Sequence, residues 1–142
     1  MQLTKKEKLH RLSTRDYAQL AEFRLALREF LHFSEQAAAN QGLTSQHYQA
    51  MLILRGTPEG VPVTINDLAL QLVIKHNSAV GLVDRLALEE LVARERSPSD
   101  RRKVDLHLTA HGREVLARLA ATHRRELKRI APVMERIFES LA

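Results

Sequence analysis

The 142-residue chain contains no cysteine, and this absence removes several classes of function at once. Disulfide bonds, thiolate catalysis, cysteine-ligated metals and thiol redox sensing are all excluded. The longest apolar run is far shorter than the roughly 18 residues that a membrane-spanning helix needs. The first residues, MQLTKKEKLHRLS, are polar and basic and lack the apolar segment of a secretory signal. We therefore expect a soluble, cytoplasmic protein without a membrane partner.

Signatures of catalysis are also missing. The sequence has no glycine-rich phosphate loop, no metal-ligand motif and no nucleophile paired with a base. We expect neither an enzyme nor a cofactor nor a bound metal. The seven histidines leave one alternative, a zinc site that joins His107 and His111 to His47 or His123. A strand end and a helix start separate His107 from His111, so these two do not share a helical face.

What the chain does have is an excess of positive charge. Lys and Arg number 22 against 17 Asp and Glu, a formal net charge of +5. Such a balance favours a polyanionic partner. Hydrophobic residues make up 44% of the chain, enough for a packed core, and the length is most simply that of one domain over residues 1–142.

Apolar periodicity and capping residues predict a mainly α protein with a small β-hairpin. The helices expected before the hairpin span about 13–40, 44–56, 64–72 and 75–89. Ser13 to Asp16 reads as a capping box, and Thr44 and Thr64 are expected to cap the next two helices. The last two helices are joined by a short turn in the sequence VIK, which together with the hairpin is the outline of a winged helix-turn-helix. The core candidates of these helices are Tyr48, Met51, Leu52, Leu54, Ile65, Leu68, Ala69, Leu72, Ala79, Leu82, Val83 and Leu86.

Period-two patterning predicts hairpin strands near 91–96 and 103–108. On the second strand, one side should carry Val104, Leu106 and Leu108, and the other Lys103, Asp105 and His107. The sequence at the tip, RSPSDRRK, places three consecutive cations in a turn that needs only Pro, Ser and Asp. We expect an anionic partner at this tip, and the alternative is a loose solvated loop.

The helix over about 75–89 should bury one side and expose Asn77, Gly81, Asp84, Arg85 and Leu88. A glycine inside a helix costs about 1 kcal/mol relative to alanine. Close approach of a DNA backbone to Gly81 would explain that cost, and a tolerated surface glycine is the alternative. Asp84 repels phosphate and is expected to hold a neighbouring cation.

The two ends of the chain are expected to form apolar helices. Thr109 should cap a long helix that Pro132 breaks or kinks, because proline lacks a backbone donor. The first helix is apolar over more of its circumference than one packing face requires, and a regular apolar stripe follows Pro132. We expect these surfaces to form a two-fold homodimer; the alternative is that the tail folds back on its own core.

From about Leu43 to Gly112 the sequence resembles the MarR (multiple antibiotic resistance regulator) family. The resemblance rests on RSPSDRRKVDLHLTAHG, the family's D-x-R wing followed by L-T and a glycine, and on LTSQHYQAMLIL, TINDLALQL and VGLVDRLALEELVAR. It implies a winged helix-turn-helix lobe over about 43–112, with dimerisation helices over about 13–40 and 113–142. It departs from the family at Glu90, where relatives usually have a glycine before the first wing strand.

The resemblance implies a sequence-specific DNA-binding regulator, a dimeric repressor of a pseudopalindromic operator. Arg102 would enter the minor groove while Asp100 braces the loop. The predicted DNA-binding residues are Lys75, His76, Asn77, Ser78, Gly81, Arg85, Arg94, Asp100, Arg101, Arg102 and Lys103.

The resemblance also implies release from DNA by a small aromatic or phenolic ligand, held between the dimer helices and the lobe. The candidate pocket residues are Phe30, His32, Phe33, His47, Tyr48 and Arg55. Two alternatives stay open: a regulator without a ligand, and a winged-helix module that contacts proteins and lacks sequence-specific DNA binding.

Overall fold

The computed structural model describes residues 2, 4–6 and 11–141. They form two compact units, one made of residues 34–123 and the other of the chain on either side. We call the first unit the lobe and the second the helix pair. Much of the N-terminal segment considered as a secretory signal, residues 1, 3 and 7–10, lies outside the described residues.

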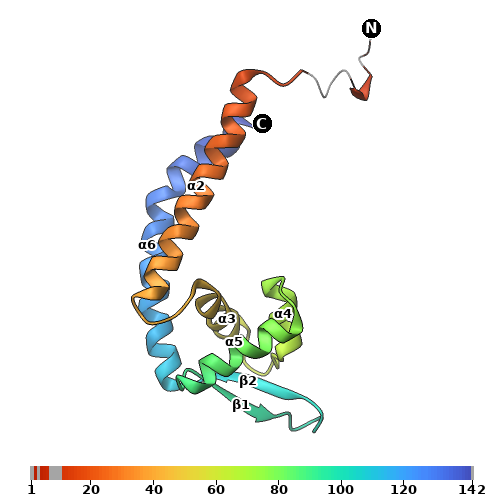
Figure 1. Cartoon of the computed structure of the whole chain (residues 1–142), viewed down its shortest axis with the longest axis vertical. Helices are drawn as coiled ribbons and strands as arrows, with labels where there is room; N and C mark the ends of the chain where they lie inside the picture. The colour runs from red at the N-terminus through yellow and green to blue at the C-terminus, as the bar shows by residue number, and fades with distance from the viewer. Residues whose placement is uncertain (1, 3, 7–10, 142) are drawn as a thin grey trace. The chain divides into compact units, whose positions relative to one another are not determined.

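The described elements are mainly helical with one antiparallel hairpin, which confirms the predicted fold class (Figure 1). In chain order they are α2 (Thr14–Ala39), α3 (Ser45–Gly56), α4 (Ile65–Leu72), α5 (His76–Leu88), β1 (Val92–Arg96), β2 (Val104–Leu108) and α6 (Ala110–Ser140). Both α2 and α6 run from one unit into the other, and the remaining elements belong to the lobe. Among the described helices, none combines the length and apolar character that crossing a membrane requires.

Thr44 and Thr64 cap α3 and α4, as predicted, and each cap is completed as a capping box. The Thr44 hydroxyl accepts from the backbone N–H of His47, and the His47 side chain accepts from the backbone N–H of Thr44. Thr64 and Asp67 make the same reciprocal pair at the start of α4. Ser13 and Asp16 do so at the start of α2. These contacts satisfy amide groups that a helix start otherwise leaves unpaired.

The lobe core is formed by α3, α4, α5, the hairpin and the first half of α6. Most predicted core residues are buried or partly buried there, and Met51, Leu68, Val83 and Leu86 are among the largest side chains with almost no exposed surface. The prediction for Leu52 was wrong, because this side chain is 43% exposed. The buried side of α3 is centred on His47, Ala50 and Met51, so Leu52 falls at its edge.

The hairpin has the predicted strands but not the predicted faces throughout. Val92 pairs with Leu108 and Arg96 with Val104 in an antiparallel register. Asp105, expected on the outward face, is only 8% exposed, and its Oδ1 has no hydrogen-bond partner among the described residues. Period-two patterning separates the two faces of a strand, but it does not say which parts of each face the rest of the chain covers.

Of the break or kink predicted at Pro132, the break does not occur, because α6 continues through this residue to Ser140. A proline inside a helix removes one hydrogen bond and costs about 3 kcal/mol or more. The turn that follows is held by packing in the helix pair, where Ile137 is 2% exposed. Tertiary packing therefore overrides the local stop signal.

Apolar surface remains on the helix pair. The rings of Phe23 in α2 and Phe138 in α6 lie with their centroids 5.9 Å apart. Leu25, off the predicted stripe of α2, is 57% exposed, and Phe138 is also largely exposed. Within the described chain, α2 therefore carries more apolar surface than its packing uses, as predicted.

A compact backbone junction links the end of α5, the hairpin and the start of α6. The Leu91 N–H donates to the Leu86 carbonyl at 2.9 Å, and the Leu91 carbonyl accepts from the Thr109 N–H at 3.1 Å. The Thr109 hydroxyl donates to the Glu90 carbonyl at 2.6 Å and accepts from the Gly112 N–H at 2.9 Å. A Cβ on Gly112 would lie 2.1 Å from the Leu91 oxygen, so the junction leaves room only for glycine.

Glu90, which departs from the family pattern, adopts a left-handed backbone conformation with φ of +57°. Its N–H donates to the Ala87 carbonyl, and the next residue closes the α5 end through Leu86. Glycine adopts this conformation without steric cost, whereas other residues pay roughly 1 kcal/mol or more. The end of α5 therefore has the backbone conformation that a glycine would adopt. Glutamate in place of the family's glycine costs conformational energy but leaves the backbone geometry of the helix end unchanged.

Gly112→Ala should lower the free energy of unfolding by about 1–3 kcal/mol, because a methyl group there forces the junction apart. Gly81→Ala is the matched control, since a Cβ on Gly81 meets nothing within 4 Å. That change should raise the free energy of unfolding by about 1 kcal/mol. Urea denaturation followed by circular dichroism measures both. Equal stability of the Gly112→Ala and native proteins would show that the junction opens without cost.

The stability of the lobe should also depend on the protonation of His47. Burial, and to a smaller extent the charge of Arg85, lower the pKa of His47, and its Nδ1 accepts hydrogen bonds from Thr44. The folded lobe thus favours the neutral ring. Its contribution is complete above the unfolded pKa of about 6.5 and declines as pH falls through that value toward the lowered one.

His47→Gln keeps a side-chain acceptor in the capping box but does not titrate. The stability advantage of the native protein over this variant should therefore shrink as the pH is lowered from 7.5 to 5. Denaturation at several pH values measures the difference. A difference that stays constant over this range would contradict the assignment of a neutral His47.

Candidate DNA interface

The turn between α4 and α5 is short and closed by backbone hydrogen bonds. Val73 adopts a left-handed conformation with φ of +55°, and the N–H of Ile74 bonds to the Ala69 carbonyl at 3.0 Å. After this turn α5 packs against α4 and β1, with Ala79, Leu82, Val83 and Leu86 buried as predicted. Figure 1 shows the hairpin tip and this turn at the end of the lobe that faces away from α6.

The first turn of α5 presents polar side chains to solvent. Lys75, His76, Asn77 and Ser78 are all exposed. Lys75 is the N-cap residue, but its side chain makes no capping hydrogen bond. His76 is held by Asn66 of α4, with Nδ1 2.7 Å from Oδ1. Sequence reasoning missed Asn66, whose only signal was its place in the preceding helix.

Gly81 lies on the exposed side of α5, one turn beyond Asn77. A Cβ built on it would meet nothing within 4 Å. Packing within the described chain therefore gives no reason for glycine at this position, and the surface there is open to close approach from outside.

Two of the predicted DNA-contacting arginines have carboxylate partners. Arg94 of β1 donates through Nη2 to Asp84 of α5, which confirms the prediction that Asp84 holds a neighbouring cation. Arg85 lies 3.3 Å from Glu89, measured from Nε to Oε1, and its Nη2 approaches the Gly42 carbonyl at 3.5 Å. The Asp84–Arg94 pair connects α5 to the first strand of the hairpin.

The wing tip, residues 97–103, is a turn organised by Asp100. Its Oδ1 accepts from the backbone N–H of Arg102 at 3.0 Å, and its carbonyl accepts from the Lys103 N–H. Ser97 closes the turn with a hydrogen bond to the Lys103 carbonyl. Asp100 therefore acts on the backbone of the tip, and the side chains of Arg101, Arg102 and Lys103 are exposed. The tip therefore carries three consecutive exposed cations.

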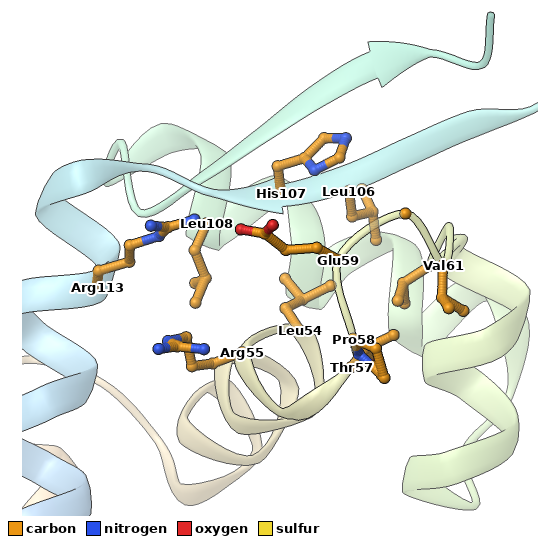
Figure 2. Close-up of a pocket in the computed structure, with 12 residues that line it drawn as sticks. Leu54, Arg55, Thr57, Pro58, Glu59, Val61, Leu106, His107, Leu108 and Arg113 are labelled. Carbon is orange, nitrogen blue, oxygen red and sulfur yellow. The ribbon is translucent and has the colours of Figure 1, made fainter.

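The six predicted ligand residues are dispersed. Phe30 lines an apolar groove in the helix pair, where Phe33 is partly buried and His32 exposed. His47 and Tyr48 are buried in the lobe, where burial raises the pKa of Tyr48. Arg55 lines a different cavity, drawn in Figure 2.

Tyr48 is part of a buried contact around His123. The two rings are stacked with centroids 4.0 Å apart. His123 Nδ1 donates to the Leu119 carbonyl at 2.7 Å, so Nε2 accepts from the Ser34 hydroxyl at 2.8 Å. Both ring nitrogens of His123 are therefore engaged in hydrogen bonds inside the lobe.

Three of the histidines considered for zinc, His47, His107 and His123, make other contacts. His107 Nε2 lies 3.6 Å from Glu95 on the neighbouring strand. Among the described residues, no group of three or more His, Cys, Asp or Glu side chains could hold a metal ion.

Comparison with known proteins points to one family. A model of the MarR family matches residues 41–103. A proposed transcriptional regulatory protein for the hcr operon of Thauera aromatica is 29% identical over 90 residues, 63% of this chain. The match spans about half of that relative, 52% of its length.

Solved structures show the same fold. AbsC, a MarR family transcriptional regulator from Streptomyces coelicolor, superposes with a TM-score of 0.71 at 25% identity, covering 92% of this chain and 83% of AbsC. A MepR variant from Staphylococcus aureus bound to an oligodeoxyribonucleotide gives 0.68 at 17% identity, covering 92% of this chain and all of MepR, 100%. The family match covers α3, α4, α5 and β1, and over these residues the chain is similar to the MarR family of winged-helix transcriptional regulators.

Proposed function

We propose that the chain is a sequence-specific, dimeric repressor that binds a pseudopalindromic operator. The observation that carries this proposal is the wing tip, where Asp100 orders the backbone of a turn that holds three consecutive exposed cations. Such a tip suits a narrow minor groove, whose concentrated negative potential attracts arginine. The exposed first turn of α5 offers the donors and acceptors that read base edges in the major groove.

The two arginines with carboxylate partners have a different part in this proposal. Arg94 is tied to Asp84 and Arg85 to Glu89, so these cations hold the wing and α5 in place and reach phosphate secondarily. Arg101, Arg102, Lys103 and Lys75 carry the electrostatic attraction, which should make binding depend on salt. In a dimer, half-sites should lie about one helical turn apart, roughly 34–36 Å.

The helix pair supports the dimer part of the proposal. Its groove of about 340 Å³ is lined by seven apolar residues of α2 and α6. Exposed leucines and Phe138 extend the apolar surface of the same unit. Continuous apolar surface of this kind marks an interaction site in a soluble protein. A second copy is the occupant that two-fold symmetry favours, and light scattering of the purified chain measures this directly.

A small aromatic or phenolic ligand is proposed to release the repressor. Such a ligand acts only by preferring a conformation that fits the operator poorly. Thermal shift against a panel of aromatic acids tests it. The competing hypothesis is a winged-helix module that contacts proteins, which would show no selected DNA sequence and little salt-dependent duplex binding.

Selection of bound duplexes from a random pool is the test of the main proposal. We expect an inverted repeat with a recurrent half-site spacing, because each protomer supplies one α5 and one wing. Recovery of unrelated sequences, or binding that ignores salt, would favour the protein-contact module.

Arg102→Ala should weaken binding to the selected operator by at least tenfold, because it removes the cation placed at the tip. The oligomeric state, measured by light scattering, should not change. Glu95→Ala, a change on the neighbouring strand that removes no cation, is the control. Unchanged affinity of Arg102→Ala in a salt-matched titration would exclude the wing from the DNA interface.

Asn77→Ala should relax base choice, with discrimination at its contacted base pair falling by about 1–3 kcal/mol. Nonspecific affinity should fall much less, since Asn77 carries no charge. Competition between operator variants measures both quantities. A uniform loss of affinity across all sequences would mean that Asn77 positions the helix and does not read a base.

A further inference from the structure

The ring of His76, the first residue of α5, is held by a side chain of the preceding helix. Its Nδ1 lies 2.7 Å from Oδ1 of Asn66, the second residue of α4. An amide oxygen can only accept a hydrogen bond, so Nδ1 carries the proton that it donates. In the neutral ring the other nitrogen, Nε2, then has a lone pair and no proton. The contact with Asn66 therefore selects one tautomer of His76.

The lone pair of Nε2 is directed away from α4. The two ring nitrogens of an imidazole point in divergent directions, so a ring that bonds Asn66 through Nδ1 turns Nε2 away from that helix. His76 is exposed, and no hydrogen bond or ion pair within the described part of the chain uses its Nε2. The start of α5 thus presents an unpaired acceptor to the surroundings.

The contact between Asn66 and His76 adds little to the stability of the fold. Both side chains are exposed, and water competes for the groups of such a pair. The packing of α4 against α5 comes from buried apolar side chains, among them Leu68 and Leu82 (Figure 1). The proton of the ring is a different matter, because the hydrogen bond that one nitrogen makes decides which nitrogen is protonated.

We propose that His76 reads an amino group on a base edge, and that Asn66 positions the ring proton so that it can. This inference rests on the proposed function, since it places the first turn of α5 in the major groove. Phosphate oxygens only accept hydrogen bonds, so a bare Nε2 gains nothing from them. The donors that base pairs offer in this groove are the amino groups of adenine and cytosine. At the same places guanine and thymine carry oxygens, which repel the lone pair of Nε2.

The neighbouring side chains do not make this choice. Lys75 can only donate, whereas the side chains of Asn77 and Ser78 can both donate and accept. Among the four exposed side chains at the start of α5, His76 alone offers an acceptor without a donor. That restriction comes from Asn66, because an imidazole free to change its tautomer could present either. Asn66 therefore narrows the base choice of a residue that it does not precede directly in the sequence.

The first measurement needs no DNA. Nuclear magnetic resonance of the full chain, labelled with ¹⁵N, distinguishes a protonated ring nitrogen from a bare one. At pH 8, where neutral rings are populated, His76 should show a protonated Nδ1 and a bare Nε2, and His76→Gln identifies its signals. Asn66→Ala should convert these signals to those of a tautomer mixture. Gln71→Ala, which removes an exposed amide of the same helix, should leave them unchanged.

The second measurement compares the duplexes that two chains select from a random pool. In Asn66→Asp a carboxylate lies beside Nδ1 and favours the doubly protonated ring, so that Nε2 becomes a donor. An acid in the first turn of α4 also suits the positive end of the helix. At one position of each half-site the native chain should select adenine or cytosine about tenfold over guanine or thymine, and Asn66→Asp should invert this preference.

Matched controls separate base reading from other effects. Gln71→Glu adds the same charge to α4 and should keep the native preference. Replacing the selected base by its analogue without the amino group, purine for adenine or 2-pyrimidinone for cytosine, should weaken native binding about fivefold. The same replacement should leave binding by His76→Ala almost unchanged, which corrects for any effect of the analogue on the duplex itself.

The possible failures are distinguishable. A proton on Nε2 in the free native chain would overturn the role of Asn66 and the predicted base class. Selection of the same operator by Asn66→Asp and the native chain would show that His76 does not read a base, while that operator would uphold the proposed function. Failure of both chains to select any operator would contradict the proposed function and the base reading together.

Discussion

The backbone of Leu91 is the constraint on which the lobe depends. Its N–H ends α5, its carbonyl receives the N–H of Thr109 where the hairpin returns, and Gly112 of α6 lies against the same oxygen. One peptide segment thus fixes the end of α5, the base of the hairpin and the start of α6. These bonds join main-chain atoms, and the Asp84–Arg94 side-chain pair adds a second link between α5 and the hairpin.

Sequence reasoning succeeded where structure is decided locally. The caps at Thr44 and Thr64 need only a side chain and an amide three residues away, so spacing alone predicted them. It failed where distant segments decide. Pro132 lies inside a continuous helix, and Asp105 is buried on a face that alternation assigned to solvent. Neither outcome can be predicted from the residues that lie close to Pro132 or Asp105 in the sequence.

The same division applies to the candidate site. Exposure of the first turn of α5 and of the wing tip followed from helical and strand periodicity. A cation beside Asp84 was also predicted, but its identity as Arg94 was not, because Asp84 lies on a helix and Arg94 on a strand. The contact between Asn66 and His76 was not predicted either, because it joins two different helices. The cavity drawn in Figure 2 could not be predicted either, because segments far apart in the sequence form it.

The Asp84–Arg94 pair has a consequence for how affinity should be interpreted. Both side chains are partly open to solvent, so mobile ions weaken their attraction as ionic strength rises. High salt would then loosen the wing as well as screen the phosphates. The slope of log affinity against log salt normally counts the counterions that DNA releases. If the chain binds DNA as proposed, that slope would contain an added contribution from within the protein and would overstate the number of phosphates contacted.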